Sequence, residues 1–128
     1  LTLGLWDAPP QQLAQLRGRP VVLAFWASWS PPSRDLLQVL NQWAAARPEV
    51  AVLAIAAEDP EPARAFAAPL GVTFPLASIA ADPPPPFDQI IAVPTTFFLD
   101  GEGTIVYVEG GTPDPGLLDR VLRPRPGA

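Results

Sequence analysis

The stretch VVLAFWASWSPPSR, residues 21–34, decides the fold of this chain. Its first seven residues are continuously apolar, and so is a second run, VAVLAIA, at 50–56. Such runs are typical of strands buried on both faces of a parallel sheet. Between the runs, apolar residues recur at helical spacing, at Leu36, Leu37, Leu40, Trp43 and Ala44. A strand, a helix and a strand of this length predict a βαβ unit.

The rest of the sequence extends this unit into a mixed sheet. TTFFL at 95–99 and TIVYVE at 104–109 flank Asp-Gly-Glu-Gly, which predicts an antiparallel hairpin. A helix is predicted over 60–70, because proline stands at its start and Gly71 follows its end. Three further elements are expected: a short strand at 74–78, a short helix at 87–92, and a final helix at 114–122 with Leu117, Leu118, Val121 and Leu122 as its buried stripe. The fold class is therefore α/β, a mixed central sheet with helices on both faces.

The bulk composition limits what the protein does. It has 128 residues, 48% of them hydrophobic, so we expect one domain over 1–128, with a lead-in at 1–20 and a frayed tail at 123–128. The formal net charge of −5 argues against nucleic-acid binding, which needs a basic face. The absence of Cys and His excludes thiolate chemistry, a zinc site of the usual kind and a Ser–His pair. We expect neither a metal nor a cofactor.

The sequence opens at Leu1 and contains no Met, so we expect that a segment was removed from its amino-terminal side. No stretch has the pattern of a signal peptide or of a membrane span. A removed signal peptide or anchor fits this start, and so does a domain cut from a longer protein. Contact with a membrane is expected only through such a missing segment.

The turn between the first long strand and its helix is where chemistry would be placed. A helix N-terminus presents free N–H groups and the positive end of the helix dipole, and both would stabilise an anionic sulfur. Two serines, Ser30 and Ser33, lie in this turn and in the first helical turn after it. Ser30, followed by proline, is fully explained as a helix N-cap. As a nucleophile it would need a base, and the sequence has neither His nor Lys.

Segments over nearly the whole sequence resemble the TlpA/ResA-like branch of the thioredoxin family. With two cysteines in place of the serines, residues 25–34 would read FWASWCPPCR, close to the motif of that branch. VPTTFFLD at 93–100 resembles the cis-proline loop and the strand that follows it. LAQLRGRP at 13–20 is similar to the lead-in to the first long strand, AIAAED at 54–59 to the end of the next strand, and 62–78 to an inserted helix and strand.

This resemblance implies a thioredoxin fold with a short helix–strand insertion, and the activity of a thiol–disulfide oxidoreductase, that is, a disulfide reductase. It implies an extracytoplasmic location, periplasmic or membrane-anchored in the full-length protein. A cysteine at position 30 would attack and one at position 33 would resolve the mixed disulfide. A cis Val93–Pro94 bond is implied too, with Val93 backbone groups free to pair with an extended peptide. We expect Trp29, Pro31, Val93 and Pro94 to form one apolar binding patch beside the helix start.

The sequence departs from the pattern of the branch in its reactive residues. Ser30 and Ser33 replace both cysteines, so the protein as written is expected to be redox-inactive. Ala24 stands where thioredoxins often carry Asp and this branch often Asn, so no carboxylate there assists proton transfer. Glu58 and Asp59 stand at the end of a strand, and in this branch an acid near the cysteines can tune them. Here there is no cysteine to tune, so we expect these acids to be solvated or to cap the following helix.

Two functions remain open at this point. In the first, the protein is a disulfide reductase whose cysteines were replaced by design. In the second, it is a naturally redox-dead binding module that presents its cis-proline loop to an extended peptide or partner protein. Replacing both cysteines exceeds what trapping a mixed disulfide needs, and Ala24 leans toward natural loss. Trp26 and Trp43 are predicted in the core and Trp29 at a contact surface.

Overall fold

Two strands in which every residue is buried form the centre of the structure, β3 (Val21–Trp26) and β4 (Ala51–Ala56). They run parallel, in register from Val21 opposite Ala51 to Trp26 opposite Ala56. Helix α1 (Pro32–Ala45) connects them. The predicted βαβ unit is therefore confirmed, and its continuous apolar runs lie in strands that are covered on both faces.

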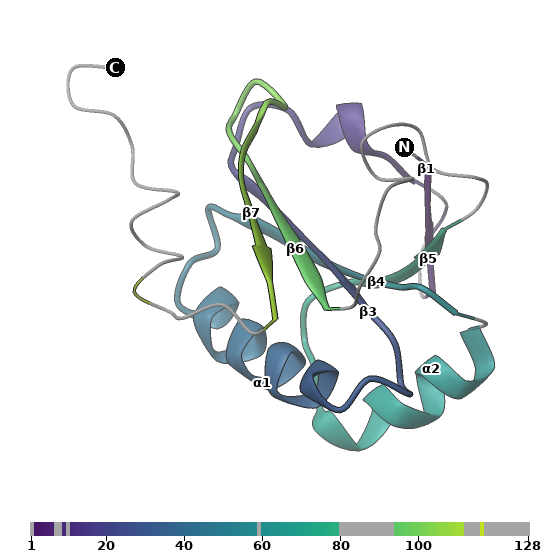
Figure 1. The fold of residues 1–128 in the computed structure, drawn as a ribbon. Helices are drawn as coiled ribbons and strands as arrows, with labels where there is room; N and C mark the ends of the chain where they lie inside the picture. The colour runs from purple at the N-terminus through teal and green to yellow at the C-terminus, as the bar shows by residue number, and fades with distance from the viewer. Residues whose placement is uncertain are drawn as a thin grey trace.

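The computed structural model describes residues 2–6, 9, 11–58, 60–79, 94–111 and 116 (Figure 1). Within them, seven strands form one sheet in the order β2-β1-β5-β4-β3-β6-β7. The other elements are β1 (Thr2–Leu5), β2 (Gln11–Gln12), the 3-10 helix η1 (Leu13–Leu16), α2 (Pro60–Ala67), the 3-10 helix η2 (Ala68–Leu70), β5 (Leu76–Ile79), β6 (Thr95–Leu99) and β7 (Ile105–Gly110). The pairs β3–β4 and β4–β5 are parallel and the other four are antiparallel, which confirms the mixed α/β sheet.

The two faces of the sheet carry separate hydrophobic clusters. One cluster joins alternate residues of the central strands, such as Val22 and Trp26, to α1 and α2, which both cover this face (Figure 1). The opposite cluster joins Leu23 and Phe25 to Leu16 of η1. The helices expected at 87–92 and 114–122 lie outside the described residues, except for Gly116, which is helical. No helix within the described ranges is long and apolar enough to cross a bilayer.

The predicted hairpin is confirmed as β6 and β7, paired antiparallel with a register shift between Phe98 and Leu99. Its turn is closed by Asp100, whose Oδ1 accepts hydrogen bonds from the N–H of Glu102 at 3.0 Å and of Thr104 at 2.9 Å. Gly103 takes a φ of +85°, a conformation that glycine adopts without steric cost. The turn is therefore stabilised by the side chain of Asp100 and by the backbone freedom of Gly103.

Two prolines shift the boundaries of the helix–strand insertion. The helix predicted over 60–70 is α-helical only to Ala67 and continues as η2, because Pro69 has no N–H for the α-helical ladder. Gly71 follows with a φ of +64° and ends the turn, as predicted. The strand expected at 74–78 begins at Leu76, directly after Pro75, which also lacks a ladder donor.

The lead-in at 1–20 contains two strands that sequence periodicity does not detect. β1 pairs antiparallel with β2 and with β5, which lies more than 70 residues later in the sequence. Trp6 secures this contact, because its Nε1–H donates to Ser78 Oγ at 2.9 Å and its ring meets Trp26 edge-on. Strands of four and two residues are too short to show a period, so only the long-range pairing reveals them.

Candidate functional site

The candidate site lies at the carboxyl ends of the parallel strands, where β3 passes into α1. The N–H of Ala57 donates to the C=O of Trp26 at 2.7 Å and closes the last rung between β3 and β4. The backbone then turns through residues 27–31 into the helix. Loops at the carboxyl ends of parallel strands are where open α/β sheets bind ligands.

Two backbone hydrogen bonds wind this loop into the helix. The N–H of Ser30 donates to the C=O of Ala27 at 3.1 Å, and the N–H of Ser33 to the C=O of Ser30 at 3.0 Å. Helix α1 begins at Pro32, and Pro31 before it already has helical dihedrals, φ −54° and ψ −39°. The proline ring holds φ in this region, so the backbone turns helical directly after Ser30, whose C=O accepts the first hydrogen bond as that of an N-cap residue does.

The start of α1 offers few free donors to an anion. Pro31 and Pro32 have no N–H, and the N–H of Ser33 is used by Ser30. Asp35 adds a negative charge in the first turn. The helix dipole therefore remains as the main source of positive potential at position 30, without the set of N–H groups that helix N-termini usually present.

The two serines are buried, although their neighbours are exposed. Ser30 retains 4% of its surface and Ser33 none, whereas Trp29 retains 68%. The Oγ of Ser33 accepts a hydrogen bond from the N–H of Ala27 at 3.2 Å. Ser33 is thus part of the loop's internal bonding, whereas Trp29 and Pro31 are exposed to solvent.

Glu58, at the end of β4, binds the loop directly, which corrects the expectation that it is solvated or caps the next helix. One carboxylate oxygen accepts from the N–H of Ser28 at 2.5 Å and the other from its hydroxyl at 3.0 Å. The carboxyl ends of β3 and β4 meet at this edge, so the carboxylate reaches Ser28 across the parallel pair. The sequence shows an acid at the end of this buried strand but not the group that it meets; Asp59 lies outside the described residues.

We expect the change Glu58→Ala to lower the free energy of unfolding by about 1–2 kcal/mol, because two hydrogen bonds to a partly buried carboxylate are lost. Urea unfolding followed by circular dichroism measures this difference. Glu102→Ala, an exposed acid in the hairpin turn, is the matched control and should change stability by less than about 0.5 kcal/mol. Equal effects of the two changes would show that Glu58 does not hold the loop.

The sheet below the loop contains two buried polar groups that the sequence analysis did not single out. Thr96 lies directly opposite Ala24 in the β3–β6 pair. Neither the hydroxyl of Thr96 nor the Nε1–H of Trp26 has a hydrogen-bond partner among the described residues. Ala24 is fully buried and provides no carboxylate at this place. The available signal for Thr96 was its position, two residues after Pro94 on a strand with apolar neighbours.

The expected binding patch is described only in part. Thr95 pairs with Phe25, so Pro94, the residue before it, lies at the end of the sheet that carries the candidate site. Pro94 is buried, and its C=O accepts from the N–H of Gly111 at 2.9 Å. Val93 lies outside the described residues, so the geometry of the Val93–Pro94 bond stays a prediction. Within the expected patch, Trp29 and Pro31 provide the exposed surface.

No cluster of three or more His, Cys, Asp or Glu side chains that could hold a metal ion occurs in the described ranges.

Trp26 and Trp43 are buried, as predicted from the sequence, and Trp29 is exposed, also as predicted. The polar groups at the site are hydroxyls, backbone groups and one carboxylate that is already paired. The sequence has no cysteine, so the site holds no thiol pair.

Comparison with known proteins gives this arrangement a family. Residues 3–108 match the AhpC/TSA family. The thioredoxin-like protein YneN of Bacillus subtilis is 33% identical over 109 residues, 78% of this chain and 61% of YneN. The thiol-disulfide oxidoreductase ResA of Geobacillus kaustophilus is 28% identical over 114 residues, 87% of this chain and 66% of ResA. The protein thus spans less than two thirds of the length of either relative.

The solved structures place the fold. The structure of MTB dsbF in its mixed oxidized and reduced forms aligns with a TM-score of 0.80 at 27% identity, over 95% of this chain and 92% of dsbF. The mixed sheet with a helix starting at the carboxyl end of β3 is thus a thioredoxin fold, as the TlpA/ResA-like motif predicted. Since the family match covers most of the sequence, the protein belongs to the AhpC/TSA family, with the thiol–disulfide oxidoreductases of thioredoxin fold as its relatives.

Proposed function

We propose that this protein is a member of the thiol–disulfide oxidoreductase family that performs no redox chemistry. The observation that carries the proposal is that both positions of the family's redox pair are serine, at 30 and 33. Disulfide exchange needs a thiolate that attacks a sulfur and a second thiol that displaces the product. A hydroxyl forms neither a mixed disulfide nor an internal one, so this protein has no dithiol that could give two electrons to a substrate disulfide.

The composition of the sequence and the hydrogen bonds described around the loop support the proposal. The sequence has no His and no Lys to act as a base. The carboxylate of Glu58 is held by Ser28, and the hydroxyl of Ser33 accepts the N–H of Ala27. Hydrolytic chemistry from Ser30 is therefore not proposed either.

We expect the protein to leave the rate of insulin reduction by dithiothreitol at the blank value. The assay follows the turbidity of the precipitating insulin at several protein concentrations. A thioredoxin with both cysteines, run in parallel, controls for the sensitivity of the assay. A rate that rises with the concentration of this protein would contradict the proposal.

A second candidate function is a binding module for an extended peptide or a partner protein, and the exposure of Trp29 favours it. An indole that keeps 68% of its surface exposed is a large contact area on a small domain. The loop that presents it is held on one side by the Ser28–Glu58 bonds and on the other by Pro31 and Pro32. A loop fixed before binding loses less entropy on association.

For this module, peptides selected from a display library against the protein should bind at least about tenfold more weakly to Trp29→Ala, since removing an aromatic anchor costs about 1–2 kcal/mol or more. Isothermal titration calorimetry measures the affinities. Tyr107→Ala removes an exposed aromatic residue from β7 and should leave them unchanged. If Trp29→Ala binds as well as the parent, or no peptide is selected, the module does not use this face.

The extracytoplasmic location that the resemblance implies is part of the same proposal. It is supported by the similarity to ResA, a thiol-disulfide oxidoreductase. Disulfides persist in oxidising compartments, where a partner-binding relative would also be placed. Fractionation of cells that express the full-length gene tests it, with recovery in the cytoplasmic fraction as the contrary result.

A further inference from the structure

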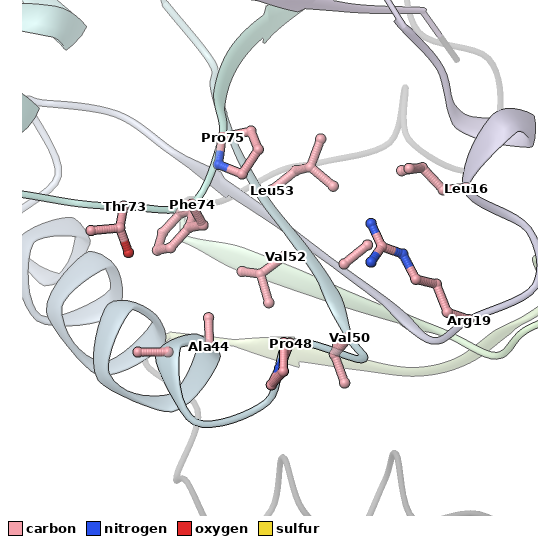
Figure 2. A pocket seen from close by; sticks show the side chains of 12 residues that line it. Leu16, Arg19, Ala44, Pro48, Val50, Val52, Leu53, Thr73, Phe74 and Pro75 are labelled. Carbon is pink, nitrogen blue, oxygen red and sulfur yellow. The ribbon is translucent and has the colours of Figure 1, made fainter.

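A hollow lies at the amino ends of β3 and β4, at the opposite end of these strands from the candidate site. It has a volume of about 340 Å³, and its floor is the first half of β4 (Figure 2). Ala44 from the end of α1, Phe74 from the segment before β5 and Leu16 from η1 form its walls. Because β3 and β4 run parallel, this hollow and the loop that carries Trp29 lie at opposite ends of the strands. The hollow is thus separate from the proposed recognition face.

Arg19 provides the charge in this hollow. Its guanidinium extends from the start of β3 toward Val52 and Leu53 (Figure 2). Among the described residues no acidic side chain pairs with it, and it makes no hydrogen bond there. Two other arginines differ in this respect, because Arg47 and Arg64 each donate to a backbone carbonyl and stack on a tryptophan. Arg19 therefore has its planar pair of donors available to a ligand.

The backbone of Val52 also faces the hollow. Ala51 donates to Pro20 on the side of β3, and Ala54 donates to Pro75 on the side of β5. Since backbone groups alternate between the two neighbouring strands, the N–H and C=O of Val52 point to the side of β5. The ladder with β5 begins only at Ala54, because Pro75 has no N–H to give to the C=O of Val52. The C=O of Val52 is thus left without a ladder partner on the side of β5.

The wall next to Val52 is already fixed. The N–H and the hydroxyl of Thr73 both donate to Asn41 Oδ1, at 2.9 and 3.0 Å. The Nδ2 of Asn41 in turn donates to the C=O of Gly71 at 3.4 Å. These bonds tie the segment before β5 to α1, so the hollow keeps its shape without a ligand. A preformed site is the usual state of small-molecule pockets.

We propose that this hollow binds a small apolar monocarboxylate, with the carboxylate on Arg19 and the apolar body against Val52 and Phe74. A guanidinium matches a planar carboxylate with two parallel hydrogen bonds. A phosphate dianion would need further donors, which the apolar walls do not supply. The volume is near the lower end of the range of about 300–1,000 Å³ for ligand pockets, which fits a ring or a short aliphatic tail. An amide N–H beside the carboxylate would pair with the C=O of Val52.

The test is a titration of the protein with 3-phenylpropanoate, followed by heteronuclear NMR of the backbone amides. The amide signals of Val52 and Thr73 and the side-chain signal of Arg19 should shift together, while those of Trp29 and Ser33 should not. The neutral analogue 3-phenylpropanamide should bind at least about tenfold more weakly, because it loses the ion pair. The change Arg19→Gln should weaken the binding of 3-phenylpropanoate to the same extent. Arg17→Gln, an exposed arginine outside this hollow, is the matched control.

A titration with N-acetylphenylalanine distinguishes two kinds of natural ligand, free carboxylic acids and N-acylated carboxyl ends. If the amide of N-acetylphenylalanine pairs with the C=O of Val52, this compound binds more tightly than 3-phenylpropanoate, which points to N-acyl amino acids or the carboxyl ends of peptides. Equal affinities point to free acids. The proposal is overturned if no shifts appear up to about 20 mM ligand, a Kd that corresponds to a binding free energy of about −2.3 kcal/mol. It is also overturned if 3-phenylpropanamide binds as well as 3-phenylpropanoate, or if Arg17→Gln weakens binding as much as Arg19→Gln.

Discussion

The double change Ser30→Cys and Ser33→Cys is expected to give a protein that reduces insulin above the blank rate. The N–H of Ser33 already donates to the C=O of Ser30 at 3.0 Å, which closes a turn over positions 30–33. The Cα atoms at the two ends of such a turn lie less than about 7 Å apart. A disulfide spans Cα separations of about 4.4–6.8 Å, so the backbone is already close to what the bond requires.

The electrostatics of the helix start also favour a thiolate at position 30, although less than at an ordinary helix. The dipole of α1 points its positive end at this position. Pro31 and Pro32 remove two N–H groups that would otherwise stabilise the anion. We therefore expect an active but modest reductase, with turnover that starts only when both cysteines are present.

Two measurements check this expectation. The double variant, titrated with mixtures of reduced and oxidised glutathione, should be oxidised to an internal disulfide, which mass spectrometry detects as a loss of two hydrogen atoms. The single variant Ser30→Cys is the control, and it should stop at a mixed disulfide with glutathione. If the double variant also stops there, the loop geometry has diverged from that of a redox pair, which would favour natural loss of the cysteines.

The change Trp26→Ala is expected to lower the free energy of unfolding by about 3–5 kcal/mol, the cost of removing a large aromatic side chain from a core. Trp26 is fully buried on β3, and its ring contacts Trp6 at 6.3 Å and Phe66 at 5.8 Å between centroids. These contacts join the central sheet to the amino-terminal segment and to α2. A single domain of this size is stable by about 5–15 kcal/mol, so the loss is a large part of the total.

The measurement is urea unfolding of three variants under identical conditions. Trp29→Ala is the matched control, because the same side chain is removed from a position that is 68% exposed, and stability should change by less than about 0.5 kcal/mol. Trp26→Phe should cost less than Trp26→Ala, because it keeps a ring and removes an indole N–H that has no partner among the described residues. Similar losses of unfolding free energy for Trp26→Ala and Trp29→Ala would contradict the conclusion that Trp26 packs in the core between the sheet, the amino-terminal segment and α2.

The central βαβ unit and the hairpin were determined by the sequence itself. Their signals are local, since apolar runs of six or seven residues, helical spacing and a turn sequence are each contained in a short window. The burial of Trp26 and Trp43 and the exposure of Trp29 follow from the same periodicities. The motif around the two serines, the VPTT loop and the hairpin together indicated the family, which the match over residues 3–108 shows.

Only the tertiary structure decided what holds the site and what else the fold carries. The bond between Glu58 and Ser28 joins residues 30 positions apart, and no local pattern shows that two strand ends meet with this spacing. β1 is recognisable only through its pairing with β5, and the hollow at Arg19 exists because Pro75 ends a ladder beside a strand that is far away in the sequence. Such contacts depend on how elements are brought together, and their energy comes from long-range packing and hydrogen bonding. The sequence lists the residues that make these contacts, but only the folded structure shows which of them lie close together.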